Sequence, residues 1–216
     1  MMSKSLHLGR TLLSTLKATS GTEQFLCLPV GVPIQAILRP IATRREVLNP
    51  DDIRCITEWR NCFVQSFLTE FQATESRTAK WLTEMVEPND NKILFMVDDL
   101  NGRTFGYMGL DFINWETGYG EADAIVRGEE APPGTMKIAL QTLLSWALGQ
   151  LGLRSLGVRV RSDNTALQFY RKLGFSEERR VPLRRVDDFD MIRWVEDSSL
   201  NPADLSLVYM LYHPRG

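Results

Sequence analysis

Residues 163–175 read DNTALQFYRKLGF. The pattern predicts a helix over Asp163 to Leu173 that ends at Gly174, because glycine readily adopts the left-handed conformation of a helix C-cap. A strand over Ser155 to Val160 precedes this helix, and a strand over Phe175 to Val181 follows it. Two strands joined through one helix run parallel, so the sheet is expected to contain a parallel pair. Ligands of open α/β sheets bind at the carboxyl ends of such strands, where the strand order switches.

An antiparallel meander is predicted ahead of this unit. Strands are expected over Lys92 to Asp98, Thr104 to Asn114 and Tyr119 to Arg127, and Asn101-Gly102 is a hairpin signal between the first two. The two-residue period of a strand places four side chains of the third strand on one face: Glu121, Asp123, Ile125 and Arg127. The strongest helix pattern of the chain follows, from Gly134 to Gln150.

Two further helices are predicted before the meander. Ala36 to Arg39 reads as a short strand that stops at Pro40, and Asn49-Pro50 begins the first helix with a capping side chain and a proline. One buried stripe is expected on it, at Ile53, Ile56, Trp59, Phe63 and Phe67. The second helix begins at Thr74 and ends at Pro88, and four of its side chains are expected to face inward: Trp81, Leu82, Met85 and Val86.

The order of these elements predicts an α/β fold with a mixed, partly antiparallel central sheet and helices on both faces. Leu205 to Tyr212 is expected to close the sheet, and residues 183–203 read as an inserted loop with a short helix around Met191 to Val195. The length of 216 residues favours one substantial domain, residues 36–216, after an N-terminal extension over residues 1–35. The extension has few acids, as in transit peptides, but its low arginine content favours an amphipathic or frayed segment.

Composition excludes several classes of protein. The 25 Lys and Arg against 27 Asp and Glu give a net charge of −2, which offers no electrostatic reason to expect nucleic acid as a partner. The apolar run from Phe25 to Ile34 is too short to span a membrane. Cys27, Cys55 and Cys62 form no metal-binding or disulfide pattern and are expected to be small buried side chains, so no metal is predicted and a cytoplasmic location is expected. A cysteine or serine nucleophile has no obvious histidine partner.

The loop from Arg127 to Met136 joins a strand to the strongest helix. Gly134 lets the backbone approach a ligand closely, and free N–H groups at residues 134–138 would form an anion site suited to a pyrophosphate. A simple helix cap is the alternative, since every loop-to-helix junction has free N–H groups. The loop matches neither a P-loop nor a dinucleotide fingerprint.

The stretch 163–175 resembles the last helix of the GNAT superfamily of acetyl-CoA-dependent N-acetyltransferases, which often reads Asn-x-x-Ala-x-x-Phe-Tyr-x-x-x-Gly-Phe. The order of elements over residues 36–212 is similar to that family. Asp163 takes the usual Asn position, and the loop Ala131-Pro132-Pro133-Gly134-Thr135-Met136 lacks the leading Arg or Gln, for which Arg127 or Lys137 could compensate. The resemblance implies acetyl-CoA as co-substrate, and the residues expected to bind it are Ile125, Val126, Arg127, Gly134, Thr135, Met136, Lys137 and Asn164.

The resemblance also implies a direct transfer of acetyl to an amine. A backbone N–H of the strand Glu121 to Val126 would polarise the thioester carbonyl, and Glu121 or Asp123 would accept the proton of the amine. Tyr170 resembles the tyrosine that protonates the leaving thiolate. Glu121 and Asp123 could equally be solvated polar residues, and Tyr170 could be a core tyrosine.

In this family the first two helices usually form the wall of the acceptor site. The residues expected there are Trp59, Arg60, Asn61, Glu70 and Phe71. The sequence looks closest to the group that acts on amino sugars or nucleotide-linked amino sugars, and Arg179, Arg180, Arg184 and Arg185 could bind a diphosphate unless nearby acids neutralise them. A protein N-terminal acetyltransferase and a non-catalytic acyl-CoA-binding module are the alternatives. The expected partner is therefore a small-molecule amine, with no nucleic acid or membrane, and the strand Leu205 to Leu211 could form the edge of a homodimer.

Overall fold

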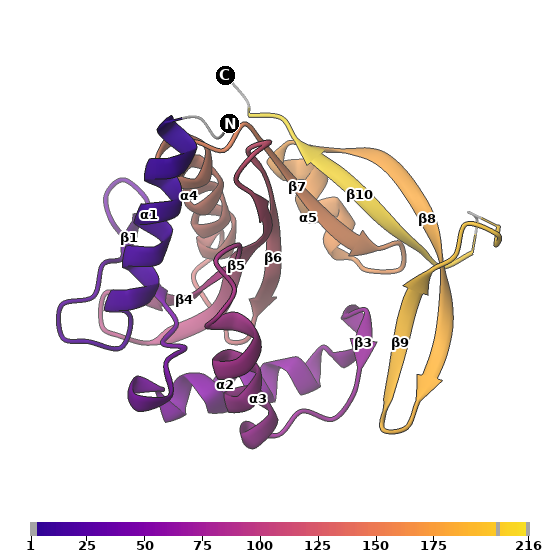
Figure 1. Cartoon of the computed structure of the whole chain (residues 1–216), viewed down its shortest axis with the longest axis horizontal. Helices are drawn as coiled ribbons and strands as arrows, with labels where there is room; N and C mark the ends of the chain where they lie inside the picture. The colour runs from indigo at the N-terminus through magenta and orange to yellow at the C-terminus, as the bar shows by residue number, and fades with distance from the viewer. Residues whose placement is uncertain (1–3, 202–203, 215–216) are drawn as a thin grey trace. The chain divides into compact units, whose positions relative to one another are not determined.

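The computed structural model describes residues 4–201 and 204–214, which form two compact units (Figure 1). The first unit combines Met1–Trp59 with Thr74–Leu156, and the second combines Arg60–Ala73 with Gly157–Gly216. The chain therefore enters the second unit after Trp59 and returns at Thr74. As a result, the segment between the first two predicted helices belongs with the C-terminal part of the chain.

The first unit contains an antiparallel sheet in the order β1-β2-β4-β5-β6. Its strands are β1 (Leu28–Val30), β2 (Ala36–Pro40), β4 (Ile93–Asp99), β5 (Thr104–Asn114) and β6 (Tyr119–Arg127). The predicted meander is confirmed as β4, β5 and β6. Strand β4 is buried from end to end except at Asp99, because helices cover the sheet and the apolar side chains of Ile93 to Val97 fill its core.

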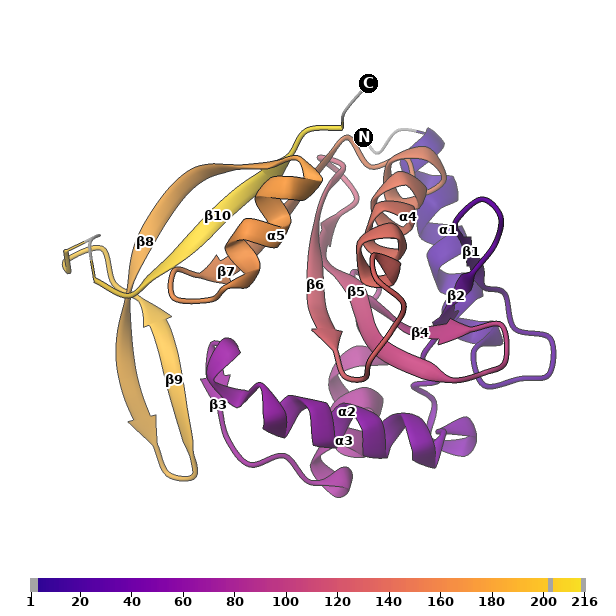
Figure 2. The same ribbon diagram turned by 180° about the vertical axis from the view of Figure 1, so that it is seen from behind.

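The helices of the first unit pack on this sheet (Figure 2). They are α1 (Lys4–Thr19), α2 (Pro50–Cys62), α3 (Glu75–Trp81) with a π-helical turn over Leu82–Val86, and α4 (Thr135–Gly149), while Arg45–Val47 forms a 3-10 turn. Helix α4 contacts β1, β2 and β5. Helix α1 buries Leu6, Leu13 and Leu16, and the Lys17 ammonium donates to the carbonyl oxygens of Val86, Glu87 and Asn89.

The expected stripe on α2 is only partly correct. Ile56 and Trp59 are buried, but α2 ends at Cys62, so Phe63 is 43% exposed and Phe67 lies beyond a 3-10 turn at Val64–Ser66. In the next helix Met85 is 64% exposed because the π-helical turn shifts its residues away from the period of an α-helix.

The second unit contains an antiparallel sheet in the order β7-β10-β8-β9-β3. Its strands are β7 (Ser155–Arg161), β10 (Ser206–Tyr212), β8 (Phe175–Asp188), β9 (Met191–Glu196) and β3 (Thr69–Glu70). Helix α5 (Ala166–Leu173) buries Leu167, Tyr170 and Leu173, and Gly174 ends it at a φ of 107° as predicted.

Three expectations for this sheet are wrong. Strands β7 and β8 run parallel but are not neighbours, because β10 pairs antiparallel with both. Strand β10 is therefore internal, and the prediction that Leu205 to Leu211 forms a dimer edge fails because its backbone groups are already paired on both sides. The region read as a loop and short helix over residues 183–203 is a hairpin in which the long strand β8 pairs with β9, so the run Met191 to Glu196 is a strand.

The cysteines are less buried than predicted. Cys27 and Cys62 are exposed and Cys55 is half-buried, so the prediction of three buried thiols is wrong. Cys27 lies just before β1, and Cys62 is the last residue of α2.

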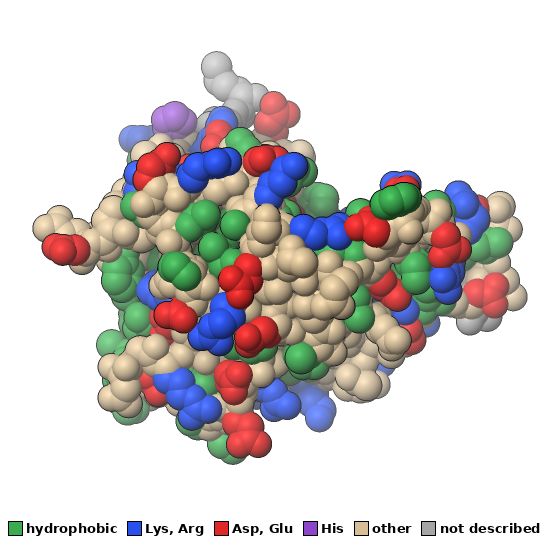
Figure 3. Space-filling view, turned by 90° about the horizontal axis from the view of Figure 1, so that it is seen from below, with side chains coloured by type: hydrophobic (Ala, Val, Ile, Leu, Met, Phe, Trp, Pro, Cys, Tyr) green, Lys and Arg blue, Asp and Glu red, His purple; other side chains and the backbone are tan. Residues whose placement is uncertain are grey.

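On the face seen in Figure 3, Lys and Arg side chains are interspersed with Asp and Glu. Among the helices of the described residues, none has the length and apolar composition needed to cross a membrane.

Candidate active site

A β-bulge interrupts β6 where the ligand-binding strand was predicted. Gly109 of β5 pairs with Asp123, but Tyr107, two residues earlier, pairs with Val126, three residues later, so β6 contains one extra residue. Ala124 has a φ of 53°, a left-handed conformation that is rare for alanine. Neither Ala124 nor Ile125 has a partner on β5. A bulge of this kind turns backbone N–H groups away from the ladder, where a ligand can accept them.

The bulge corrects the predicted alternation along β6. Glu121 and Asp123 do share a face, since Asp111, Leu110 and Gly109 pair with consecutive residues from Glu121 to Asp123. The extra residue reverses the alternation, so Arg127 lies on the opposite face and Ile125 lies within the bulge. Val126 is buried, and Arg127 is exposed at the end of the strand.

The turn before α4 lies where it was predicted, at Gly134. Gly134 has a φ of 89°, and a side chain added there would meet nothing within 4 Å. The Thr135 N–H and hydroxyl both donate to the Pro132 oxygen, and the Ile138 N–H donates to the Gly134 oxygen. The anion site is thus smaller than predicted: within the described hydrogen bonds, the N–H groups of Gly134, Met136 and Lys137 keep no backbone acceptor, whereas those of Thr135 and Ile138 are already used. The Lys137 side chain is exposed beside them.

Glu121 and Asp123 have different partners. Glu121 is 7% exposed and accepts a hydrogen bond of 2.9 Å from the Tyr119 hydroxyl. Asp123 accepts one of 2.6 Å from the ammonium of Lys92, which donates equally to Asp111. Burial disfavours the charge on Lys92, but the two carboxylates outweigh it and raise its pKa above the ordinary lysine value. The Lys92 ammonium also lies 5.8 Å from the centre of the Trp81 ring, so this face of β6 is the one that α3 covers.

Trp59 packs against the end of the same strand. Its ring stacks on Tyr107 at 6.3 Å between centroids, and a Cβ on Gly128 would overlap the indole. With 4% exposure, Trp59 offers little surface to an acceptor. Its contacts fix the loop after β6, which is consistent with a supporting rather than a direct role.

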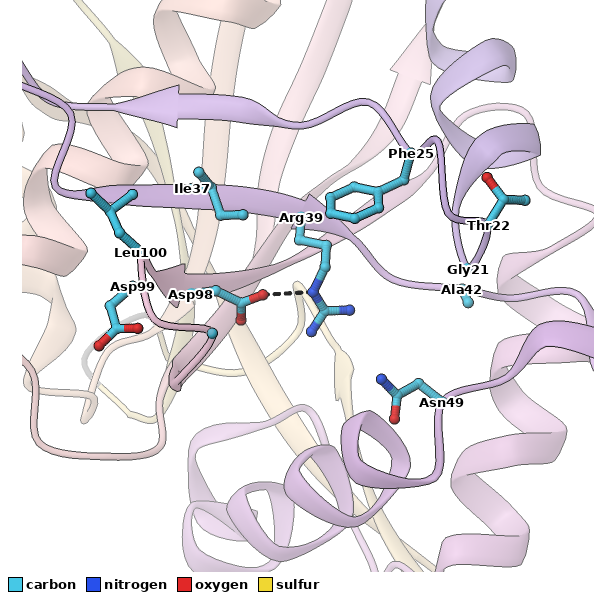
Figure 4. A pocket seen from close by; sticks show the side chains of 11 residues that line it. Gly21, Thr22, Phe25, Ile37, Arg39, Ala42, Asn49, Asp98, Asp99 and Leu100 are labelled. Carbon is cyan, nitrogen blue, oxygen red and sulfur yellow. Dashed lines mark hydrogen bonds and ion pairs between the residues drawn. The ribbon is translucent and has the colours of Figure 1, made fainter.

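A pocket in the first unit lies away from these residues (Figure 4). It is lined by β2, the end of β4 and the loop after α1, and Arg39 lies in it. The Arg39 guanidinium donates to Asp98 at 2.6 Å and to both oxygens of Asp52 at 2.9 Å. None of the predicted site residues lines this pocket. The Arg39 guanidinium in it already has two carboxylate partners, Asp52 and Asp98.

In the second unit, Tyr170 lies on α5, and Asn164 lies two residues before this helix begins. Tyr170 is 6% exposed, and its ring packs edge to face against Phe169 and Phe175 at 5.6 and 5.7 Å between centroids. This packing fits both interpretations of the tyrosine, because a buried ring can still direct its hydroxyl to a ligand. The Asn164 side chain accepts the Ala166 N–H, so it caps the start of α5.

The last turn of α2 and the segment between α2 and α3 hold the other predicted acceptor residues. The Arg60 guanidinium stacks on the rings of Phe67 and Phe71, at 4.3 Å from each centre, and donates to Thr69. The Asn61 side chain exchanges two hydrogen bonds with the backbone of Ala73, so it closes the segment into a loop. Four of the five predicted acceptor residues therefore belong to one stretch of the second unit, which begins in the last turn of α2 and ends at Ala73: Arg60, Asn61, Glu70 and Phe71.

Sequence reasoning missed the residue that anchors this loop. Arg161 is 6% exposed and donates to Glu70 at 2.8 Å and to both oxygens of Asp163. The Trp194 indole N–H donates to the same Glu70 oxygen at 2.6 Å. A signal was present, since Arg161 follows directly on the buried Val160 in an apolar strand. Lys92 was missed similarly, at the start of the apolar run of β4.

The arginines proposed for a diphosphate are mostly paired. Arg180 donates to Glu177, Arg184 to Asp197 and Arg185 to Asp187, at 2.5 to 3.0 Å. Arg179 instead lies 3.5 Å from the centre of the Tyr209 ring. The interpretation as neutralised surface cations is therefore the better one for Arg180, Arg184 and Arg185, and the case for a diphosphate acceptor is weakened.

Comparisons with known proteins agree on one family. A family model described as an acetyltransferase (GNAT) domain matches residues 43–176. A spermidine N-acetyltransferase from Vibrio cholerae, solved with CoA and spermine, superposes with a TM-score of 0.63 at 19% identity and covers 82% of this chain and 94% of its own. A probable GNAT acetyltransferase from Chromobacterium violaceum gives a TM-score of 0.62 at 18% identity, covering 82% of this chain and 86% of its own. The search among curated proteins found no match. The structural likenesses support the GNAT-like fold predicted from the order of elements.

Proposed function

The chain belongs to the acetyltransferase (GNAT) domain family and is an acetyl-CoA-dependent N-acetyltransferase, and we propose that it acetylates a primary amine of a small, cationic acceptor by direct attack. The proposal is carried by two features that follow one another in the same unit, the bulge of β6 and the turn at Gly134. The bulge offers backbone N–H groups to a thioester oxygen, and the start of α4 offers N–H groups to a pyrophosphate. Lys137 adds a positive charge beside that turn.

Attack of the acceptor on the thioester requires a general base, because the ammonium form of the amine has no lone pair. Glu121 and Asp123 lie on the face of β6 that α3 covers, ahead of the bulge, and either could take the proton directly or through a water molecule. Attack of the neutral amine on the thioester carbonyl forms the C–N bond, and collapse of the tetrahedral intermediate breaks the C–S bond. Tyr170 remains the proposed proton donor to the departing CoA thiolate, because a phenol has a higher ordinary pKa than a thiol.

The charge on this face supports a cationic acceptor. Lys92 with Asp111 and Asp123 carries a net charge of −1, and Glu121 lies on the same face. A negative surface raises the local concentration of ammonium compounds. Polyamines such as the spermidine of the Vibrio cholerae enzyme therefore become the first acceptors to test. The amino-sugar prediction has no support from the comparisons, and the pairing of Arg180, Arg184 and Arg185 weakens its nucleotide-linked form.

A thiol-release assay tests the proposal. Purified protein with acetyl-CoA is offered spermidine, spermine, simple amino sugars, nucleotide amino sugars and short peptides, each beside its fully N-acetylated form as a blocked control. We expect release of CoA with the polyamines and none with the blocked amines. Release only with peptides would replace the small amine by a protein N-terminus, and no release with any amine would refute the proposed acceptor class.

A further inference from the structure

Arg161 joins three segments of the second unit that are far apart in sequence. Its Nη1 donates to Glu70 at 2.8 Å and to the Phe67 oxygen at 3.3 Å, while its Nε and Nη2 hold the two oxygens of Asp163 at 3.1 and 2.8 Å. Its guanidinium also lies 4.9 Å from the centre of the Trp194 ring. One side chain thus contacts the loop before β3, the start of the α5 region and the β8–β9 hairpin.

The hairpin completes the arrangement through its own contacts. Strand β9 pairs with β3, the Trp194 N–H donates to the Leu68 oxygen at 2.8 Å, and its indole N–H donates to Glu70. The paired residues of the hairpin, 183–188 and 191–196, lie beyond residue 176, where the family match ends. Partial burial of Glu70 opposes its ionisation, but the hydrogen bonds from Trp194 and Arg161 outweigh this and hold its pKa below the ordinary value.

We propose that Arg161 is a positioning residue for acceptor binding, which holds the Glu70 carboxylate and the loop before α5 in one arrangement that the β8–β9 hairpin completes through Trp194. This inference rests on the proposed function, because it assumes that the segment from Arg60 to Phe71 takes part in binding the amine. A planar guanidinium can hold both oxygens of Asp163 and still donate to Glu70, since its donors are spread over a rigid fork, whereas a lysine ammonium is a single point.

The first test separates acceptor binding from chemistry. Trp194→Phe removes one hydrogen bond to Glu70 and keeps an aromatic ring beside Arg161. We expect an acceptor KM about tenfold higher, the loss typical of one hydrogen bond to a charged group, with kcat and the KM for acetyl-CoA within about twofold. Arg161→Lys keeps the charge and is expected to raise the acceptor KM at least as much. Arg184→Lys, in an exposed ion pair of the same hairpin, is the control and should match wild type.

A double-mutant cycle and hydrogen exchange address the coupling itself. If Glu70 and Trp194 act together, Glu70→Gln with Trp194→Phe should raise the acceptor KM no more than the worse single change. Arg161→Lys should speed amide exchange at residues 67–70 and at 164–167 together, a readout that does not depend on turnover. An unchanged acceptor KM in an active, folded Trp194→Phe protein, or additive effects, would overturn this inference alone. If the wild-type protein released no thiol with any of the amines, the proposed acceptor class would be overturned, and this inference with it.

Discussion

Glu121 and Asp123 are two residues apart on one strand, yet their surroundings differ. Asp123 accepts a hydrogen bond from the Lys92 ammonium, whereas Glu121 accepts one from the Tyr119 hydroxyl. We therefore predict that Glu121→Gln lowers kcat/KM for the amine by roughly 100- to 10,000-fold, as loss of a general base does. Steady-state kinetics at saturating acetyl-CoA would measure the effect.

Asp123→Asn is the matched comparison. It should leave more activity than Glu121→Gln and instead lower the free energy of unfolding by about 1 kcal/mol, because Lys92 loses one of its two carboxylates at a partly exposed site. Denaturant unfolding of both variants would show this. If Asp123→Asn were inactive and Glu121→Gln active, the roles of the two carboxylates would be reversed.

Tyr170 provides a second prediction at the level of single residues. Tyr170→Phe keeps the ring contacts with Phe169 and Phe175 and removes only the hydroxyl. We expect kcat to fall by about 10- to 10,000-fold with the affinity for CoA nearly unchanged, because only protonation of the leaving group is lost. Calorimetric titration with CoA would confirm that binding is intact. Wild-type turnover in this variant would remove Tyr170 from the mechanism and leave it as a core tyrosine.

At the scale of elements, the start of α4 depends on one backbone conformation. Gly134 lies at a φ of 89° with open space around its Cα, so Gly134→Ala introduces backbone strain but no clash. We predict a loss of roughly 1–2 kcal/mol in stability, the cost of a left-handed conformation for an L-residue, and weaker binding of acetyl-CoA. Thermal unfolding and CoA titration would test the two parts.

Gly149 offers a control on the same helix. It also has nothing within 4 Å, but its φ is not in the left-handed region, so Gly149→Ala should raise stability by about 0.5 kcal/mol and leave CoA binding unchanged. Equal effects of the two substitutions on CoA binding would show that the turn at Gly134 does not contact the cofactor.

For the whole molecule, α1 raises the question of where the folded domain begins. A Cβ on Gly9 would lie 2.0 Å from the Leu151 oxygen, so the helix backbone packs directly on the connection after α4. We predict that Gly9→Ala destabilises the protein by roughly 1–3 kcal/mol, the cost of overpacking. Leu8→Ala, at a site 59% exposed, should change stability by less than about 0.5 kcal/mol. If Gly9→Ala, Leu8→Ala and the wild-type protein had equal unfolding midpoints, the first 35 residues would be a dispensable extension.

Sequence alone determined the local elements. The hairpin signal at Asn101-Gly102, the apolar period of α4 and the cap at Gly174 predicted strands and helices close to their observed bounds, because turns, caps and amphipathic stripes depend on neighbours within a few residues. The motif around Tyr170 likewise led to the family, and Gly134 was correctly placed at the turn before α4, although its left-handed conformation was not predicted.

Tertiary structure decided how these elements pair and which polar groups meet. The extra residue in β6, the insertion of β10 between β7 and β8, and the β8–β9 hairpin all depend on hydrogen bonds between distant strands. The partners of Lys92 and Arg161 lie up to 31 and 94 residues away in sequence. A buried charge requires a counter-charge nearby, but its position along the chain is set by the packing of the sheet, and no local pattern encodes it.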